Sequence, residues 1–176
     1  MNLSRRFVIE AVLVAIYGEL MVPSQPVQYI IPYSTIMELY EMKDSKEPVM
    51  PDPEDDAHVK TKIGELIAFF DDPFNRKKLE RSLAAPWRLS PPLPINDNVT
   101  FVIVNAMENA QYGEGFDPIE TEVVLASIRE QAPIITDQVE LMEKIIQSEV
   151  PVQVYDVYDF DFAVEQGISA DDWMTP

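Results

Sequence analysis

The sequence predicts an α/β fold with a mainly parallel central sheet of four to five strands and helices on both faces. Short runs of β-branched and apolar residues alternate with segments of helical periodicity along the chain. The run VTFVIV at 99–104 lacks polar alternation, which is typical of a strand buried on both faces. A length of 176 residues with 47% hydrophobic residues suits one domain with a core. We expect one three-layer domain over 1–167 and a mobile tail over 168–176.

The first quarter of the chain has a strand–helix–strand–helix pattern. Its first apolar run ends in an acid, Glu10, and Pro23 and Pro26 mark a turn before the second run. Thr35 and Glu38 have the spacing of a capping box, which opens a helix. The expected elements are a strand over 7–10, a helix over 11–20, a strand over 27–31 and a helix over 35–42.

The middle of the chain begins with a solvated loop over 43–56, where three prolines and many acids occur. Apolar residues then recur at helical spacing. A proline-rich connection with Trp87 leads to the strand over 99–104, and a glycine-containing loop follows over 105–116. The two helices predicted before that connection cover 56–70 and 73–83.

The last third again alternates helices and strands. Asp117, Pro118 and Glu120 supply a cap, a first-turn proline and a third-position glutamate, the pattern of a helix start. The expected elements are a helix to about residue 130, a strand over 133–136, a helix over 139–147, a strand over 150–155 and a helix over 159–165.

Composition excludes several kinds of site. The chain has no cysteine and one histidine, His58, which excludes thiolate metal sites and zinc sites built on several histidines. A metal would therefore be held mainly by oxygen, which favours Mg²⁺, Mn²⁺ or Ca²⁺. The net charge of −18 argues against broad DNA binding. Arg5 and Arg6 precede an apolar segment that Glu10 interrupts, and that segment is too short to span a membrane, so we expect a cytoplasmic protein.

Four acids follow strands or open helices. Glu10 ends the first strand, Glu38 lies in the helix after the second, and Asp137 follows the strand over 133–136. Glu120 opens the helix that leads into that strand. In a parallel sheet the strand-to-helix turns lie on one edge, where ligands gather, so at least three of the four acids are expected to converge.

The order of these elements resembles the PIN-like nuclease domains. The run FVIE at 7–10 looks like their opening strand, which ends in an acid. A second acid follows the next strand within a helix, here Glu38. The segments ETEVVLA at 120–126 and APIITD at 132–137 are similar to their closing signature, and 150–154 to their last strand. The resemblance implies a ribonuclease or phosphodiesterase in which Glu10, Glu38, Glu120 and Asp137 bind Mg²⁺ or Mn²⁺. Glu10 and Glu120 stand where the family usually has aspartate.

Each acid also has a plainer interpretation. Glu38 and Glu120 fit the third position of capping boxes, while Asp117 and Asp137 fit helix caps. Glu10 is the hardest to explain this way, because a carboxylate in an apolar run needs a partner. A salt bridge to an unidentified base is its alternative. Glu122 is either a supporting acid or an exposed helical residue.

The helix over 73–83 carries four basic residues, Arg76, Lys77, Lys78 and Arg81, in an otherwise acidic chain. They suggest contacts to a nucleic-acid backbone, for example single-stranded RNA. A solvated helix face paired with nearby acids is the alternative. Trp87 suggests either base stacking or a partly buried loop anchor, and His58 is expected at the surface.

Three hypotheses of function remain open. The first is the metal-dependent nuclease. The second is a non-catalytic binding or regulatory module of the same fold, with a homodimer as one arrangement. The aspartate-to-glutamate departures and the net charge favour it. The third, a protein that binds a small molecule or nucleotide in the same crevice, has no motif behind it.

Overall fold

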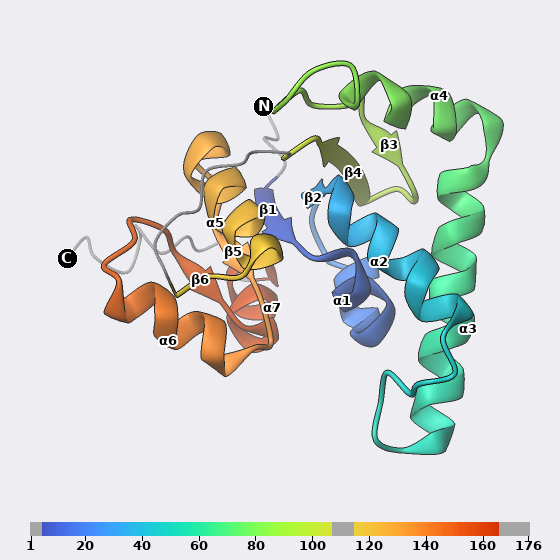
Figure 1. The fold of residues 1–176 in the computed structure, drawn as a ribbon, viewed down its shortest axis with the longest axis horizontal. Helices are drawn as coiled ribbons and strands as arrows, with labels where there is room; N and C mark the ends of the chain where they lie inside the picture. Colours follow the sequence, from blue (N-terminus) through green and yellow to red (C-terminus); the bar gives the residue numbers. More distant parts are fainter. Residues whose placement is uncertain (1–4, 107–114, 166–176) are drawn as a thin grey trace.

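A computed structural model describes residues 5–106 and 115–165. Its six-stranded sheet has the order β3-β4-β2-β1-β5-β6 (Figure 1). Every neighbouring pair is parallel except β3 and β4, which are antiparallel. The strands are β1 (Arg5–Ile9), β2 (Val27–Pro32), β3 (Leu93–Pro94), β4 (Val99–Val104), β5 (Ile134–Ile135) and β6 (Val154–Tyr155).

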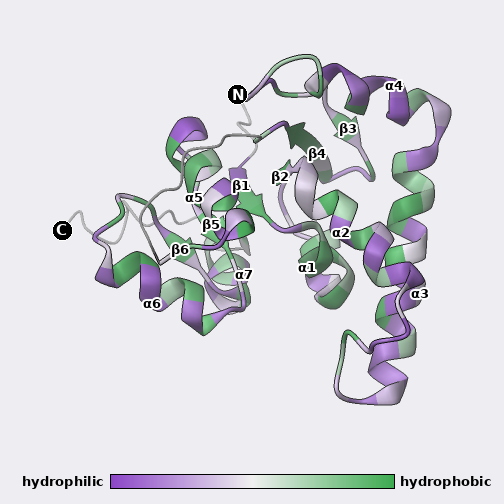
Figure 2. Cartoon of the chain, viewed as in Figure 1, coloured by the Kyte–Doolittle hydropathy of each residue, from purple (hydrophilic) through white to green (hydrophobic). Residues whose placement is uncertain are grey.

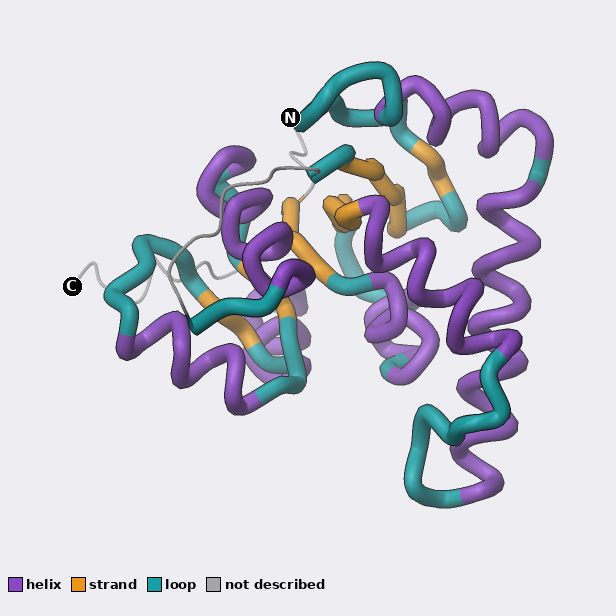
Figure 3. Tube along the Cα trace, in the orientation of Figure 1, coloured by secondary structure: helices purple, strands orange, loops and turns teal. Residues whose placement is uncertain are grey.

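Helices cover both faces of this sheet, so the fold is a mainly parallel α/β sandwich, as the sequence predicts (Figure 3). On one face lie α1 (Ala11–Ile16), the 3₁₀ turn η1 (Gly18–Met21), α2 (Tyr33–Asp44), α3 (Pro53–Asp71), α4 (Pro73–Ser82) and α7 (Val157–Glu165). On the other face lie α5 (Pro118–Glu130) and α6 (Val139–Gln147).

Two hydrophobic cores fill the sandwich because strand residues alternate between its faces. Phe7 and Ile9 of β1 point into the larger core with Phe101 and Phe160, whereas Val8 points into the core beneath α5 and α6. The rings of Phe7 and Phe160 meet edge to face at 5.2 Å between centroids. In Figure 2, α1 is mostly hydrophobic and α4 mostly hydrophilic, which matches deep burial of α1 and surface placement of α4.

Most predicted elements are confirmed, and several of their ends differ. The helix predicted over 11–20 ends at Ile16, and a 3₁₀ turn follows. The solvated loop is shorter than expected, because Asp52 accepts a hydrogen bond from the backbone N–H of Asp55 and starts α3 at Pro53. The sheet has six strands rather than four to five, since the proline-rich connection adds the two-residue β3 beside β4. The predicted tail over 168–176 and residues 107–114 of the predicted loop lie outside the described residues.

The capping box predicted for Thr35 and Glu38 is wrong. Helix α2 begins two residues earlier, at Tyr33, with Pro32 as its N-cap and no side-chain cap. The Thr35 hydroxyl instead donates to the carbonyl of Pro32 at 2.8 Å and accepts from the backbone N–H of Ala11 at 3.2 Å. Ala11 is the first residue of α1, so Thr35 satisfies a donor that has no partner within that helix.

Candidate functional site

The register of the sheet places four strand ends on one edge. Val8 of β1 pairs with Ile30 of β2 and with Ile134 of β5, and Ile30 pairs with Val102 of β4. The strands that follow β1 in the chain, up to β4, lie on one side of it. The next two, β5 and β6, lie on its other side. The connections therefore change direction between β1 and β5. Such a switch point is where open α/β sheets bind ligands.

Glu10 lies at this switch point, directly after β1. It is half-buried and forms the N-cap residue of α1 without a capping hydrogen bond. Burial, together with the charges of Glu38, Asp137, Asp117 and Glu120, in decreasing order, raises the Glu10 pKa from 4.5 to about 7. We call these five residues the carboxyl-edge acids. The predicted site residues Glu38, Asp137 and Glu120 are therefore near enough to Glu10 for their charges to act on it.

The sequence suggested a basic partner for Glu10, but the residue that bonds its carboxylate is a carboxamide, Gln138. Its Oε2 accepts a long hydrogen bond, 3.5 Å, from Nε2 of Gln138. Within the described ranges, no lysine or arginine forms an ion pair with Glu10. The salt bridge considered from the sequence is therefore absent there. The cost of burying the Glu10 carboxylate and its repulsion by the other acids are not offset by a positive charge among these residues.

Glu38 lies on α2 and is also half-buried. Burial raises its pKa, and the negative charges of Glu41, Asp117 and Glu122 raise it further. Glu122, on α5, accepts a hydrogen bond from the hydroxyl of Ser34 at the start of α2. Glu122 is half-buried, so its interpretation as an exposed helical residue is wrong, and burial raises its pKa despite that hydrogen bond.

Glu120 has two structural partners. It forms the predicted capping box with Asp117, in which each side chain bonds the other residue's backbone N–H. The same carboxylate oxygen, Oε1, accepts from the backbone N–H of Asp117 at 2.9 Å and from Nζ of Lys144 at 2.8 Å. None of the hydrogen bonds found among the described residues uses its Oε2. The capping interpretation of Asp117 and Glu120 is confirmed, and it leaves one oxygen of Glu120 for another ligand.

Asp137 is exposed and does not cap α6, whose N-cap is Gln138. Instead it accepts a hydrogen bond of 2.9 Å from the hydroxyl of Tyr17, at the end of α1. Burial and this hydrogen bond raise the pKa of Tyr17 to about 12, so the phenol stays a donor at neutral pH. The backbone N–H of Gln138 donates to the hydroxyl of Thr136, and no side chain caps the start of α6.

Sequence reasoning missed several residues that shape this site: Tyr17, Ser34, Thr35, Gln138 and Lys144. Ser34, Thr35 and Gln138 lie in or next to the first turn of a helix that follows a strand, a place that a search of the strand-to-helix junctions could have included, whereas Tyr17 follows the end of α1. Lys144 lies in the last turn of α6. Its contact with Glu120 depends on how α5 and α6 pack together, which no local pattern encodes.

The donor set suits a divalent cation in its chemistry. The carboxyl-edge acids offer only oxygen, the donor preferred by Mg²⁺ and Mn²⁺, and their repulsion around Glu10 would be relieved by added positive charge. Over residues 5–106 and 115–165, however, no three acidic or histidine side chains are close enough to hold one ion as they stand. The residues fit a metal in kind and in charge, but they are not gathered into a finished coordination shell.

The basic residues of α4 lie elsewhere. This helix packs beside α3 and β4, not on the acids. Arg76 forms an ion pair of 2.5 Å with Asp71, and Lys78 donates to the carbonyl of Pro92 while its Nζ lies 4.6 Å from the centre of the Phe74 ring. Lys77 and Arg81 are exposed. The solvated-face interpretation is thus confirmed for Arg76, which pairs with a nearby acid.

Trp87 and His58 match their plainer interpretations. Trp87 is half-buried, and the guanidinium of Arg129 lies 4.7 Å from the centre of its ring. His58 is exposed on α3. We therefore assign neither residue to the site.

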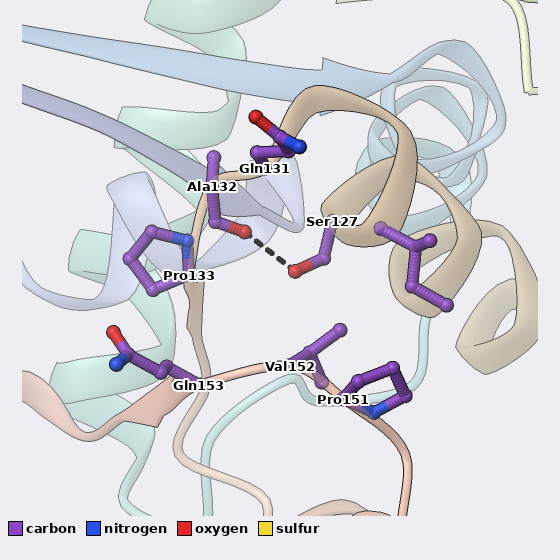
Figure 4. Close-up of a pocket in the computed structure, with 8 residues that line it drawn as sticks. Ser127, Gln131, Ala132, Pro133, Pro151, Val152 and Gln153 are labelled. Carbon is purple, nitrogen blue, oxygen red and sulfur yellow. Dashed lines mark hydrogen bonds between the residues drawn. The ribbon is translucent and has the colours of Figure 1, made fainter.

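A cavity of about 300 Å³ lies at the opposite edge of the sheet, beside the starts of β5 and β6 (Figure 4). One of its walls is fixed by a hydrogen bond from the Ser127 hydroxyl to the carbonyl of Ala132. Its lining has no charged residue: Ser127, Ile128, Gln131, Ala132, Pro133, Pro151, Val152 and Gln153. Nothing in this lining points to a particular ligand, so the carboxyl edge remains the candidate site.

Comparison with known proteins adds no assignment. No protein-family model matches the sequence, and no curated protein matches it either. No helix in the described part of the chain is long and apolar enough to cross a membrane.

Proposed function

We propose that this chain is a PIN-like, metal-dependent ribonuclease or related phosphodiesterase that acts at its carboxyl edge. Glu10, Glu38, Glu120 and Asp137 would hold Mg²⁺ or Mn²⁺, and single-stranded RNA is the proposed substrate. The observation that carries the proposal is the position of Glu10 at the switch point, where burial and then the charges of neighbouring acids raise its pKa to about 7, with no ion pair to Glu10 among the described residues.

When bound, the metal would lower the pKa of a water molecule and stabilise charge on the scissile phosphate. The chain's own residues supply the frame. Thr35 ties the turn after Glu10 to the start of α2, and Tyr17 orients Asp137 through its hydroxyl. Glu120 can contribute only the oxygen that Lys144 and the capping box leave unused. The proposal includes side-chain rearrangement of Glu10 and Glu38, because the acids as they stand are too far apart to share one ion.

The first test is metal binding. Thermal melting of the wild type with and without Mn²⁺ or Mg²⁺ should show stabilisation of roughly 2.7 kcal/mol once the free metal reaches 100 times its Kd. The Glu10→Gln variant should lose most of this shift. Glu19→Gln is the matched control, because Glu19 is exposed on η1 and is not one of the carboxyl-edge acids.

The second test is chemistry. The wild type should cleave single-stranded RNA in Mn²⁺, and Glu10→Gln should not. Cleavage by Glu10→Gln at the wild-type rate would remove Glu10 from the site. Absence of both a metal shift and cleavage in the wild type would overturn the proposed function.

One observation favours a second candidate, a non-catalytic module of the same fold that binds a partner or forms a homodimer. Glu120 is already engaged by Lys144 and by the capping box, and the described acids do not form a finished metal shell. This candidate predicts no metal shift at millimolar Mn²⁺ and no cleavage. Both candidates include a cytoplasmic location, which fits a chain that contains no cysteine.

A further inference from the structure

One cation stands among the carboxyl-edge acids. Of the five ion pairs found in the described residues, only that of Lys144 with Glu120 involves one of these acids. Asp117 is close enough to Lys144 to act on its charge as well. Among the described residues, Lys144 is therefore the one basic residue that forms an ion pair with a carboxyl-edge acid.

Glu120 holds this lysine in place. The Glu120 side chain is 9% exposed, and the capping box fixes it in the first turn of α5. The Lys144 side chain is 38% exposed. On the same helix, Leu141 and Ile145 are buried in the core that α5 and α6 share, so α6 is anchored beneath the lysine. A buried, hydrogen-bonded acid therefore sets the position of a partly exposed ammonium group.

The ammonium group has capacity left for a ligand. It carries three N–H donors, and its one hydrogen bond within the described chain is to Glu120. A phosphodiester that approaches five carboxylates is repelled by them, so a cation beside them lowers the cost of its approach. Lysine binds phosphate as a point charge, and needs no second planar contact to do so.

We propose that Lys144 binds a phosphate oxygen of the RNA beside the carboxyl-edge acids, and that Glu120 is the positioning residue for its ammonium group. This inference rests on the proposed function, and it assigns the residue that contacts the substrate backbone. It also explains why a buried acid of the candidate site is paired with a lysine whose remaining donors have no partner in the described chain.

The test measures binding of a short, labelled single-stranded RNA by fluorescence anisotropy in Mn²⁺ over a range of salt concentrations. Lys144→Met should weaken binding about tenfold, and the slope of log K against log salt should fall by about 0.7, the value for one phosphate contact on a single strand. Lys144→Arg keeps the charge and should restore most of both quantities. The matched control is Lys60→Met, which breaks a lysine–aspartate pair on α3 and should bind like the wild type.

A second variant guards against misfolding, because Lys144→Met leaves Glu120 unpaired. The double variant Glu120→Gln/Lys144→Met removes the buried charge, and it should fold and still show the reduced salt slope. A salt slope equal to that of Lys60→Met in both variants would overturn the role of Lys144, while RNA cleavage by the wild type would leave the proposed function standing. If the wild type shows neither RNA binding nor a metal shift, both proposals fall.

Discussion

The hydroxyl of Tyr17 donates a hydrogen bond of 2.9 Å to Oδ2 of Asp137, across 120 positions of sequence. The contact joins the end of α1 to the turn after β5, the two segments that border the switch point of the sheet. Asp137 itself is exposed, so without this bond its side chain would be free to rotate in solvent. The bond holds the Asp137 side chain beside the end of α1.

Replacing Tyr17 with Phe should therefore affect metal binding more than stability. Loss of one exposed hydrogen bond should cost about 0.5–1.5 kcal/mol of unfolding free energy at most. Mn²⁺ affinity should fall about 10- to 100-fold, the usual effect of removing a group that orients a metal ligand. Calorimetric titration measures the affinity. Tyr40→Phe is the control, because Tyr40 donates to Asp71 at 2.6 Å in a contact outside the carboxyl edge; equal loss of affinity in both variants would contradict the assignment.

The raised pKa of Glu10 predicts how stability changes with pH. In the folded protein the pKa is raised from 4.5 to about 7. The folded state therefore binds more protons than the unfolded state between these values, and stability falls as the pH rises through that window. Glu10→Gln stays neutral and lacks this loss. At pH 8 without divalent metal it should be more stable than the wild type by about 3 kcal/mol, since each pKa unit represents roughly 1.4 kcal/mol.

Urea denaturation of both proteins at pH 4.5 and pH 8, in the presence of a chelator, measures this difference. The two should be similar in stability at the lower pH. Glu143→Gln, at an exposed position on α6, is the control for loss of a charge. If the difference in unfolding free energy between the wild type and Glu10→Gln is the same at both values of pH, the pKa of Glu10 is not raised.

Thr35 should be sensitive to loss of its hydroxyl rather than to its shape. Thr35→Val leaves the N–H of Ala11 without its partner in a buried position, which should cost about 1–3 kcal/mol. Thr35→Ser keeps the hydroxyl and should cost less. Chemical denaturation compares them, and Mn²⁺ titration should show weaker binding only for the valine variant, because that variant loosens the turn after Glu10. Equal stability of the two variants would count against the hydrogen bond.

The contact between Ser34 and Glu122 should stabilise the protein in a pH-dependent way. Burial raises the pKa of Glu122, and the Ser34 hydroxyl lowers it by donating to the carboxylate. Ser34→Ala should therefore raise this pKa further. It should cost about 1–2 kcal/mol at pH 8, where the carboxylate is charged, and less at pH 4.5. Denaturation at the two values of pH measures the effect, with Ser24→Ala at an exposed position as the control.

The fold was predictable wherever one segment carries its own signal. The helix at α5 could be placed because Asp117, Pro118 and Glu120 form a complete start, and β4 because its apolar run is uninterrupted. The start of α2 was misplaced, because Thr35 has the spacing of a cap but bonds Ala11, a residue of another helix. The strand β3 was missed because two residues that pair with β4 leave no periodicity to detect.

The sequence could predict which acids lie near the strand-to-helix turns, but not the side chains that contact them. A parallel sheet brings its strand-to-helix turns to one edge, so the acids at those turns could be expected to converge. The contacts that adjust them come from residues whose roles depend on tertiary packing. Tyr17 contacts Asp137 from the end of α1, and Lys144 contacts Glu120 from the last turn of α6.

The two ends of the sheet are electrically unequal. One end gathers five carboxylates, while the cavity at the other is lined without a single charge. The carboxylates repel a polyanion such as RNA from the edge where the proposed chemistry would occur, unless bound cations first neutralise them. Divalent ions would then set the rate of encounter as well as the rate of reaction, and the protein would remain idle toward nucleic acid wherever such ions are scarce.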